Sequence, residues 1–349
     1  MPEPLATMAD VAARAGVSVA TVSRALRGSD LVSAATTARV RAAADALGFS
    51  VSRSASGLAT GRAGRIAVLV GGTLGAWFNG SILDAIYGRL READHELSIF
   101  RILSQAEREE FFTTLPARRN ADAIIVASFA LTRAERARLN ALSMPVVYLN
   151  QQARGAVSVS IDDVAAVRAG VRYLANLGHR RIGFARAENR MGFSYSAVQR
   201  IDGFRAEQSA AGVPVEDQVI VTADDARDGD GLLGRLLAVD TLPTALLVDS
   251  DELAMSLLEA MSRVGLRAPE DLSVLGFDDH ALARSFGLST IAQPVATLGE
   301  QAATMALTLA AGQPLRTRVV SVPTRLVPRR TTGRLDPAEP DSADKRRSR

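Results

Sequence analysis

Short apolar runs alternate with helical stretches along most of the chain. The runs are continuous, as in buried strands, whereas apolar residues in the other stretches recur every three to four positions, as in helices. The expected strands cover residues 66–70, 97–102, 123–127, 146–149, 157–161, 182–185, 219–221, 245–248 and 273–277. The expected helices cover residues 80–93, 107–115, 164–177, 201–211, 231–238, 253–264 and 295–311. Repeated strand–helix units predict an α/β fold with doubly wound parallel sheets, here in two lobes with a ligand cleft between them.

The first sixty residues follow a different, all-helical pattern. Thr7 is suited to cap a short helix and Gly16 to end it, because glycine accepts the left-handed backbone of a helix C-terminus. Ser18 caps a second short helix, and Ser33 a third that ends near Gly48. Two short helices joined by a tight glycine turn predict a helix-turn-helix, whose second helix enters the DNA major groove. Other small helical proteins also contain such pairs, so the pair alone leaves that alternative open.

The wider pattern resembles the lactose/purine repressor family, the LacI family. Residues 10–24 read Asp-Val-Ala-x-x-Ala-Gly-Val-Ser-x-x-Thr-Val-Ser-Arg, which is similar to the DNA-binding headpiece of that family. Residues 177–184 and 265–279 resemble two further family segments, and the resemblance spans roughly residues 7–334. It implies a transcriptional repressor with a two-lobed, periplasmic-binding-protein-like core. It also implies a homodimer on a palindromic double-stranded operator, controlled by a small-molecule effector, expected to be a sugar, in the cleft.

The resemblance also implies where the domains begin and end. The expected boundaries are residues 7–50 for the headpiece, 51–64 for a hinge that becomes helical on DNA, 65–160 with 293–318 for the first lobe, 161–292 with 319–335 for the second lobe, and 336–349 for a disordered tail. Ile82, Ile86 and Leu90 form a helical stripe that suits either the dimer interface or ordinary core packing.

By the same resemblance, Val19, Ala20 and Arg24 read bases. The Arg24 guanidinium can fork onto guanine O6 and N7, whereas Val19 and Ala20 offer only apolar contact, for example to a thymine methyl group. The alternative for Val19 is mere solvent exposure. Other polar residues are better placed for phosphates, which fix register without reading sequence; these are Thr7, Ser18, Thr21, Ser23, Arg27 and Ser33.

Ala55 and Leu58 match the hinge pattern of the family. Leu58 is expected to act as an apolar wedge in the minor groove that opens the central base step. Gly57 lies inside this hinge, where it costs roughly 0.8–1 kcal/mol relative to alanine. The hinge is therefore expected to fold only on DNA. A passive tether is the alternative.

Six residues are the candidates for effector binding. Arg200 matches the arginine that family members point into the cleft, and its planar fork suits vicinal hydroxyls or a carboxylate. Asp278 ends an expected strand and either accepts ligand hydroxyls or caps a helix. Trp77 and Phe78 follow the first strand, and Trp77 suits either a sugar-stacking platform or packing between the lobes. Asn150 and Ser250, also at strand ends, are weaker candidates.

Composition and charge narrow the function classes. The chain has 349 residues with a net charge of +3, and residues 1–65 hold eight arginines against four acidic residues, so positive charge is concentrated in the headpiece. There is no cysteine, which excludes a disulfide, a thiolate zinc site and a cysteine nucleophile. No signal peptide or membrane-length apolar run is found, so we expect a cytoplasmic protein with no membrane partner.

The sequence contains no strong motif for an enzyme active site. Residues 71–75 are glycine-rich after a strand but lack the full dinucleotide pattern and a Walker lysine. The three histidines have no metal-ligand spacing. We therefore expect no enzyme activity, no cofactor and no metal. Two alternatives to a repressor are a sugar receptor without DNA activity and a metabolic enzyme with an appended DNA module.

Overall fold

The computed structural model describes residues 6–26, 29–49, 62–118, 120–152, 155–188 and 194–335. They belong to two compact units, one up to Gly64 and the other from Arg65 onward. The hinge residues Ala55 and Leu58, the headpiece residue Arg27 and the tail 336–349 lie outside the described residues. None of the described helices is both long and apolar enough to span a membrane.

The first unit contains three helices, α1 (Met8–Ala15), α2 (Val19–Leu26) and α3 (Ala34–Ala46). The Thr7 hydroxyl accepts a hydrogen bond from the Asp10 backbone N–H, and the Asp10 carboxylate accepts one from Thr7, which forms a capping box. Gly16 ends α1 with a left-handed backbone (φ 64°, ψ 39°), which explains why glycine stands there. The predicted helix-turn-helix is therefore confirmed.

The small core of this unit forms where the apolar sides of the three helices meet. Val11 of α1, Val22 of α2 and Val40 of α3 are each fully buried. Alanines at neighbouring positions let the helices approach closely, and Leu47 and Phe49 pack against the cluster after α3. The opposite side of α2 is left in solvent.

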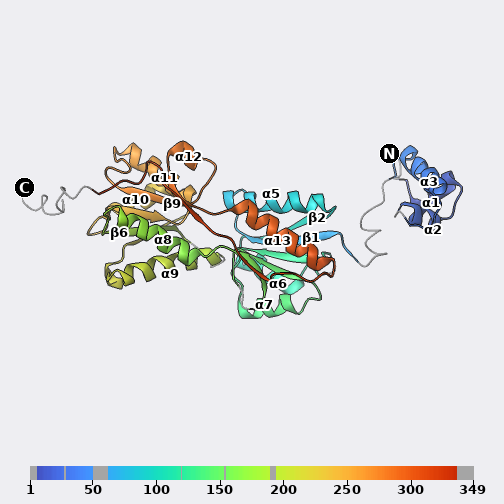
Figure 1. The fold of residues 1–349 in the computed structure, drawn as a ribbon, viewed down its shortest axis with the longest axis horizontal. Helices are drawn as coiled ribbons and strands as arrows, with labels where there is room; N and C mark the ends of the chain where they lie inside the picture. Colours follow the sequence, from blue (N-terminus) through green and yellow to red (C-terminus); the bar gives the residue numbers. More distant parts are fainter. Residues whose placement is uncertain are drawn as a thin grey trace, which may run out of the picture. The chain divides into compact units, whose positions relative to one another are not determined.

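The first lobe of the second unit is built on a six-stranded parallel sheet in the order β11-β5-β4-β3-β1-β2. Helices α5 and α13 cover one face and α6 and α7 the other (Figure 1). The strands are β1 (Arg65–Gly71), β2 (Glu96–Ile102), β3 (Ala123–Ala127), β4 (Val146–Leu149), β5 (Val157–Ser160) and β11 (Val319–Ser321). The helices are α5 (Trp77–Glu92), α6 (Gln105–Thr114), α7 (Arg133–Asn140) and α13 (Val295–Ala310).

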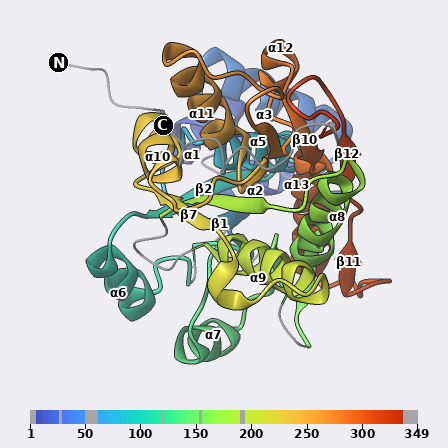
Figure 2. The same cartoon turned by 90° about the vertical axis from the view of Figure 1, so that its left-hand side faces the viewer.

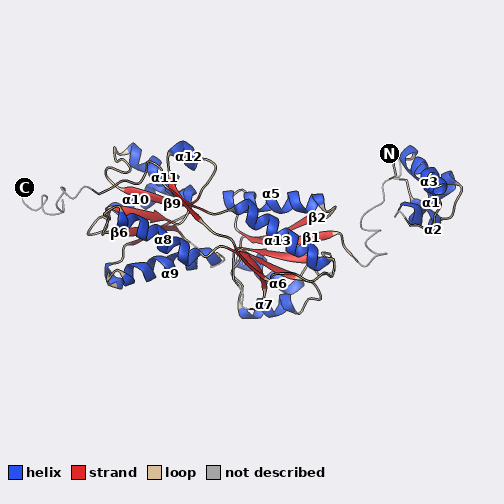
Figure 3. Ribbon diagram, viewed as in Figure 1, coloured by secondary structure: helices blue, strands red, loops and turns tan. Residues whose placement is uncertain are grey.

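The second lobe repeats this architecture with the order β12-β10-β9-β8-β6-β7, in which only β12 is antiparallel to its neighbour (Figure 3). The strands are β6 (Ile182–Ala187), β7 (Ile220–Ala223), β8 (Ala245–Val248), β9 (Ser273–Asp278), β10 (Ser289–Ala292) and β12 (Arg325–Val327). The helices are α8 (Asp163–Asn176), α9 (Tyr195–Ala210), α10 (Gly229–Leu237), α11 (Asp251–Arg263) and α12 (Ala283–Phe286), with a 3₁₀ turn at Val215–Asp217. Figure 2 shows α8 and α9 side by side.

Burial explains why the strands read as continuous apolar runs. Every residue of β3 and β9 is buried, because helices cover both faces of each sheet. The predicted α/β fold with two doubly wound sheets is confirmed. Five short elements, α7, α12, β10, β11 and β12, were not among the expected ones.

Two expectations need correction. Because β11 pairs with β5 in the first sheet, the chain makes its last crossing to the second lobe after Ser321 and not at residue 318. Ile82, Ile86 and Leu90 are at most 1% exposed, and they belong to the core between α5, α13 and the first sheet. The interpretation of this stripe as a dimer interface is wrong, because its side chains are already covered within one chain.

Candidate functional site

The solvent side of α2 carries the three residues expected to read bases. Val19 is 46% exposed, and Ala20 and Arg24 are also exposed, whereas Val22 and Ala25 on the other side of the helix are buried. The Arg24 guanidinium has no hydrogen-bonding partner within the described parts of the chain, and the side chain is exposed. Helical spacing places these side chains on the exposed side of one short helix, with Val19 and Ala20 in its first turn and Arg24 in its last.

The expected phosphate contacts cluster at helix beginnings. Thr7, Ser18 and Ser33 are exposed, and their hydroxyls accept the backbone N–H groups of Asp10, Thr21 and Thr36. Thr21 and Ser23 are partly exposed on α2. A helix N-terminus presents free backbone N–H groups and partial positive charge, which suits a phosphate.

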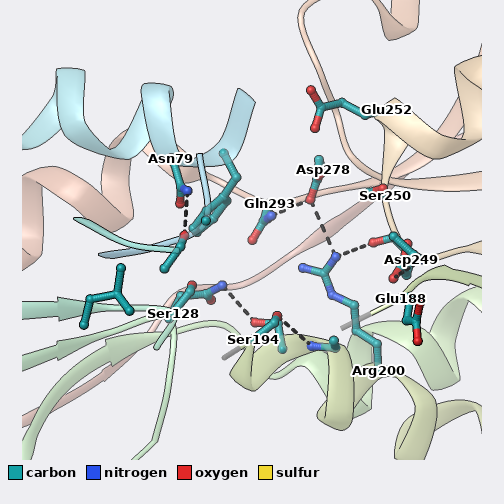
Figure 4. Close-up of a pocket in the computed structure, with 18 of the residues that line it drawn as sticks. Asn79, Ser128, Glu188, Ser194, Arg200, Asp249, Ser250, Glu252, Asp278 and Gln293 are labelled. Atoms are coloured by element: carbon teal, nitrogen blue, oxygen red, sulfur yellow. Dashed lines mark hydrogen bonds and ion pairs between the residues drawn. The ribbon is translucent and has the colours of Figure 1, made fainter. Parts of the chain in front are cut away.

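In the second unit a cavity of about 440 Å³ opens between the two lobes (Figure 4). Its walls come from the carboxyl ends of strands in both sheets. Gly71, Ser128 and Asn150 follow or end strands of the first lobe, and Asp249 and Asp278 do so in the second. Parallel α/β sheets bind ligands at this edge, because the chain there leaves the sheet in loops whose side chains converge.

Arg200 of α9 is the central cation of the cavity, and it is only 7% exposed. Its Nε donates to Asp163 Oδ1 at 2.8 Å, and its Nη1 donates to the Asp249 carbonyl and lies 3.7 Å from Asp278 Oδ1. Its guanidinium carbon lies 3.6 Å from the centre of the Phe277 ring. These contacts hold the planar group in one orientation, as Figure 4 shows for Arg200, Asp249 and Asp278.

The carboxyl groups around Arg200 are buried, and burial disfavours their charged form. Burial raises the pKa of Asp249 to about 6, although Arg200 and the Ala187 backbone N–H act in the opposite direction. Burial likewise raises the pKa of Asp163 and, more strongly, that of Asp278, against the opposing effect of Arg200. At Asp249 and Asp278, which line the cavity, the neutral form of the carboxyl group is therefore favoured more than it is in water.

Four residues that line the cavity each have a buried side-chain oxygen that lacks a hydrogen-bonding partner within the described protein. These oxygens are Ser128 Oγ, Asn150 Oδ1, Asp249 Oδ1 and Gln293 Oε1. The other ends of two of these side chains are fixed, since Asn150 donates to Ser196 Oγ at 3.1 Å and Gln293 donates to Asp278 Oδ1 at 2.5 Å. A buried unpaired polar atom costs about 1–3 kcal/mol, so each of these oxygens requires a partner, either water or a bound molecule.

Five of the six expected effector residues line this cavity, namely Phe78, Asn150, Arg200, Ser250 and Asp278. The sixth, Trp77, does not. Its ring centre lies 5.2 Å from that of His280, which follows β9 in the second lobe, so Trp77 packs between the lobes. The expected sugar-stacking role of Trp77 is corrected to the alternative, packing between lobes. Asp278 does not cap α12, whose N-cap is Leu282.

Sequence reasoning missed Ser128, Asp249 and Gln293. Ser128 and Asp249 each come directly after a buried strand, so this position alone could have marked them. Gln293 follows β10, which was not predicted. Within the described ranges, no group of His, Asp and Glu side chains could hold a metal ion.

Comparisons with known proteins identify relatives of both units. Residues 7–52 match a family model described as bacterial regulatory proteins, lacI family, and residues 171–332 match a periplasmic binding protein-like domain. The chain is 32% identical to the regulator GalS of Salmonella typhimurium over 310 residues, which cover 88% of this chain and 90% of GalS. It is 31% identical to the repressor CytR of Escherichia coli, covering 89% and 92% of the two chains. A crystal structure of the Lac repressor dimer, bound to operator and an anti-inducer, has a TM-score of 0.82 at 27% identity and covers 95% of this chain and 100% of that one.

Proposed function

Because the chain belongs to the LacI family of bacterial regulatory proteins, we propose that it binds a palindromic operator as a homodimer under the control of a cavity ligand. The chain is a DNA-binding transcriptional regulator and not an enzyme. The proposal names a sugar or sugar derivative as the ligand, and the cytoplasm as the location. The observation that supports this proposal is that one chain combines an exposed helix α2 with a polar cavity between two lobes.

For DNA, we propose that α2 enters the major groove with Val19, Ala20 and Arg24 facing the bases. Arg24 supplies the only charged contact of the three, and a bidentate contact to guanine is worth about 1–3 kcal/mol of discrimination. Thr7, Ser18, Thr21, Ser23 and Ser33 would hold phosphates and thereby fix the register of the helix. On the basis of the family resemblance, we also propose that Arg27 contacts phosphate and that the hinge residues Ala55 and Leu58 bind in the minor groove.

For the ligand, the cavity supports a small polyhydroxylated molecule. A volume of about 440 Å³ suits a monosaccharide-sized compound, and Phe78 offers an apolar wall beside amide, hydroxyl and carboxyl groups. Arg200 and Asn150 would orient the ligand from opposite lobes. A ligand that bridges the lobes binds one lobe arrangement better than another, and this difference is what allosteric control requires.

For the dimer, we propose an interface formed by exposed apolar side chains of the second unit. Tyr87 of α5 is 50% exposed, and Leu282 and Phe286 beside and within α12 are 52% and 40% exposed. Helices α5 and α12 both lie along the upper side of the second unit in Figure 1. A second copy of the chain is the proposed occupant, because the similar Lac repressor structure is a dimer.

The base-reading proposal is tested by comparing Arg24→Lys with the unchanged chain. Lysine keeps the positive charge but not the guanidinium fork, so non-specific DNA affinity should stay within about twofold. Preference for the operator should fall by roughly tenfold, in line with the loss of one bidentate contact. Fluorescence anisotropy on operator and scrambled DNA measures both. An unchanged operator preference would remove Arg24 from the reading set.

A further inference from the structure

The turn that follows β9 belongs both to the cavity and to the contact between the lobes. Asp278, the last residue of β9, lines the cavity. Two residues further on, the centre of the His280 ring lies 5.2 Å from that of Trp77 in the first lobe. The imidazole orientation is fixed, because His280 Nδ1 accepts the Leu282 backbone N–H at 2.9 Å. One short segment, turn 278–280, therefore joins the two features.

The backbone of turn 278–280 is unusual for residues that carry a side chain. The φ angles of Asp278 and Asp279 are 124° and 60°, in the left-handed region that favours glycine. Such a backbone costs free energy and persists only where the surrounding structure holds it. Arg329 provides one such contact, since its guanidinium donates to Asp279 Oδ1 at 2.6 Å, but both side chains of this pair are partly exposed.

Asp251, the first residue of α11, holds the turn from the interior of the lobe and is fully buried. Its Oδ2 accepts the His280 backbone N–H at 2.8 Å, and its Oδ1 accepts the Thr290 hydroxyl at 2.7 Å. The oxygen of that hydroxyl in turn accepts the Asp279 backbone N–H at 3.4 Å. The two backbone N–H groups that follow Asp278 are thus connected to one carboxyl group, the second directly and the first through Thr290.

The space around the Asp251 carboxyl group fits only that group. A Cβ atom at Gly276 of β9 would collide with Asp251 Oδ1, which explains why glycine stands there. Burial raises the pKa of Asp251 to about 7, although the hydrogen bonds from Thr290 and His280 act in the opposite direction. A buried carboxyl group is unfavourable unless its oxygens are hydrogen-bonded, so displacement of the turn would leave Asp251 unsatisfied. The carboxyl group and the turn therefore stabilise each other.

The first lobe has a similar arrangement on its side of the contact. Trp77 begins α5, and Phe78 next to it lines the cavity. We propose that Asp251 is a positioning residue, which holds turn 278–280 so that the cavity and the contact between Trp77 and His280 change together. Coupling between two sites needs a physical element that both of them bias, and the turn is that element. This inference rests on the proposed function only in taking the cavity as the ligand site.

Trp77 is the only tryptophan of the chain, so its fluorescence in the full-length protein tests the proposal without ligand or DNA. His280→Ala removes the ring contact, and the change that it causes in emission at pH 8 defines loss of the contact. Asp251→Ala should reproduce at least half of that change, because it releases the turn. Asp251→Asn should reproduce less than a fifth, since its amide can still accept from the His280 N–H and donate to Thr290. No change in His280→Ala would refute the contact and the proposal with it.

Asp228→Ala is the matched control, because Asp228 is another carboxyl group at the start of a helix in the same lobe. It caps α10 and accepts the Gly231 backbone N–H at 2.9 Å, and it makes no hydrogen bond to turn 278–280. Its loss should lower the melting temperature and leave the emission of Trp77 unchanged. If Asp251→Ala likewise lowers the melting temperature without changing the emission, its role is only structural and the proposal is overturned.

A substitution in the cavity tests whether the turn carries the change to the other lobe. Asp278→Asn alters the cavity end of the turn and should change the emission of Trp77 in the otherwise unchanged chain. In the Asp251→Ala chain, the same substitution should cause less than half of this change. Equal changes in both chains, or no change in either, would overturn the proposal. If circular dichroism shows that Asp251→Ala does not fold, Thr290→Val replaces it with the same deciding outcomes, because valine removes the buried hydroxyl with little change in shape.

Failure of this inference is distinguishable from failure of the proposed function. The fluorescence measurements use neither operator DNA nor a ligand, so unchanged emission would refute the role of Asp251 and leave the regulator intact. A sugar that changes the emission of Trp77 in the unchanged chain, but less than half as much in Asp251→Ala, would support the coupling. If that sugar leaves operator affinity unchanged in fluorescence anisotropy, the coupling stands and the sugar is not the effector.

Discussion

Replacement of Arg200 by methionine probes the charge balance on which the cavity depends. The side chain is 7% exposed, and Asp163, Asp249 and Asp278 around it are each at most 9% exposed. Methionine fills much of the same volume but leaves these buried carboxyl groups without their cation. Removal of one partner from a buried ion pair costs about 3–5 kcal/mol, and we expect a loss of that size in the free energy of unfolding at pH 8.

The free energy of unfolding that Arg200→Met loses should become smaller as the pH decreases. Burial already raises the pKa values of Asp163, Asp249 and Asp278, and loss of Arg200 raises them further. A carboxyl group whose pKa is higher in the folded state stabilises the fold at low pH, and this contribution is lost as the pH rises through the folded-state pKa. One such proton is worth about 1.4 kcal/mol per pH unit, so between pH 8 and pH 6 about 2.7 kcal/mol of the loss should be recovered.

Urea unfolding followed by circular dichroism at pH 6 and pH 8 measures both effects. Arg168→Met is the matched control, because Arg168 pairs with Glu207 at 2.7 Å but its side chain is 42% exposed. Such a surface pair should contribute less than about 1 kcal/mol, with little change between the two pH values. The reasoning is refuted if Arg200→Met costs no more than Arg168→Met, or if its cost is the same at both pH values.

Three further predictions concern other parts of the molecule. Gly16→Ala should destabilise the helix-turn-helix by about 1 kcal/mol in hydrogen exchange of the full chain, because φ is +64° although the space is open; Gly75→Ala, in equally open space, is the control and should have almost no effect. Trp77 is the only tryptophan and contacts His280 across the lobes, so its fluorescence should change when a ligand fills the cavity; binding in calorimetry with constant emission would contradict this. Phe286→Asp should shift the chain from dimer to monomer in analytical ultracentrifugation, and an unchanged mass would exclude that surface from the interface.

The sequence predicted most of the fold because of how strongly the sheets are covered. Buried strands such as β3 and β9 have no polar outer face, so they read as uninterrupted apolar runs. Helix α7 was missed because Leu139 is its only buried residue, which leaves no apolar periodicity to detect. The three-residue strand β12 is too short to show any pattern.

The site was only partly predictable, for a different reason. Arg200 and Asp278 were found from family resemblance, and the structure places them 3.7 Å apart between Nη1 and Oδ1. The environment of Trp77 depends on His280, about two hundred residues further along the chain, and no local pattern contains that contact. Asp249 was overlooked because a single acidic residue after a strand carries no signal of its own, and only the fold shows that it lines the cavity and contacts Arg200.

The central claim is that the headpiece binds a specific DNA sequence and that the second unit controls this binding through its cavity. The most direct measurement is fluorescence anisotropy of the full-length chain on DNA fragments from around its own gene, with and without a ligand identified by calorimetry. We predict that one fragment binds at least 10³-fold more tightly than unrelated DNA and that the ligand changes this affinity by roughly 5- to 150-fold. Equal affinity for all fragments, with and without the ligand, would contradict the account.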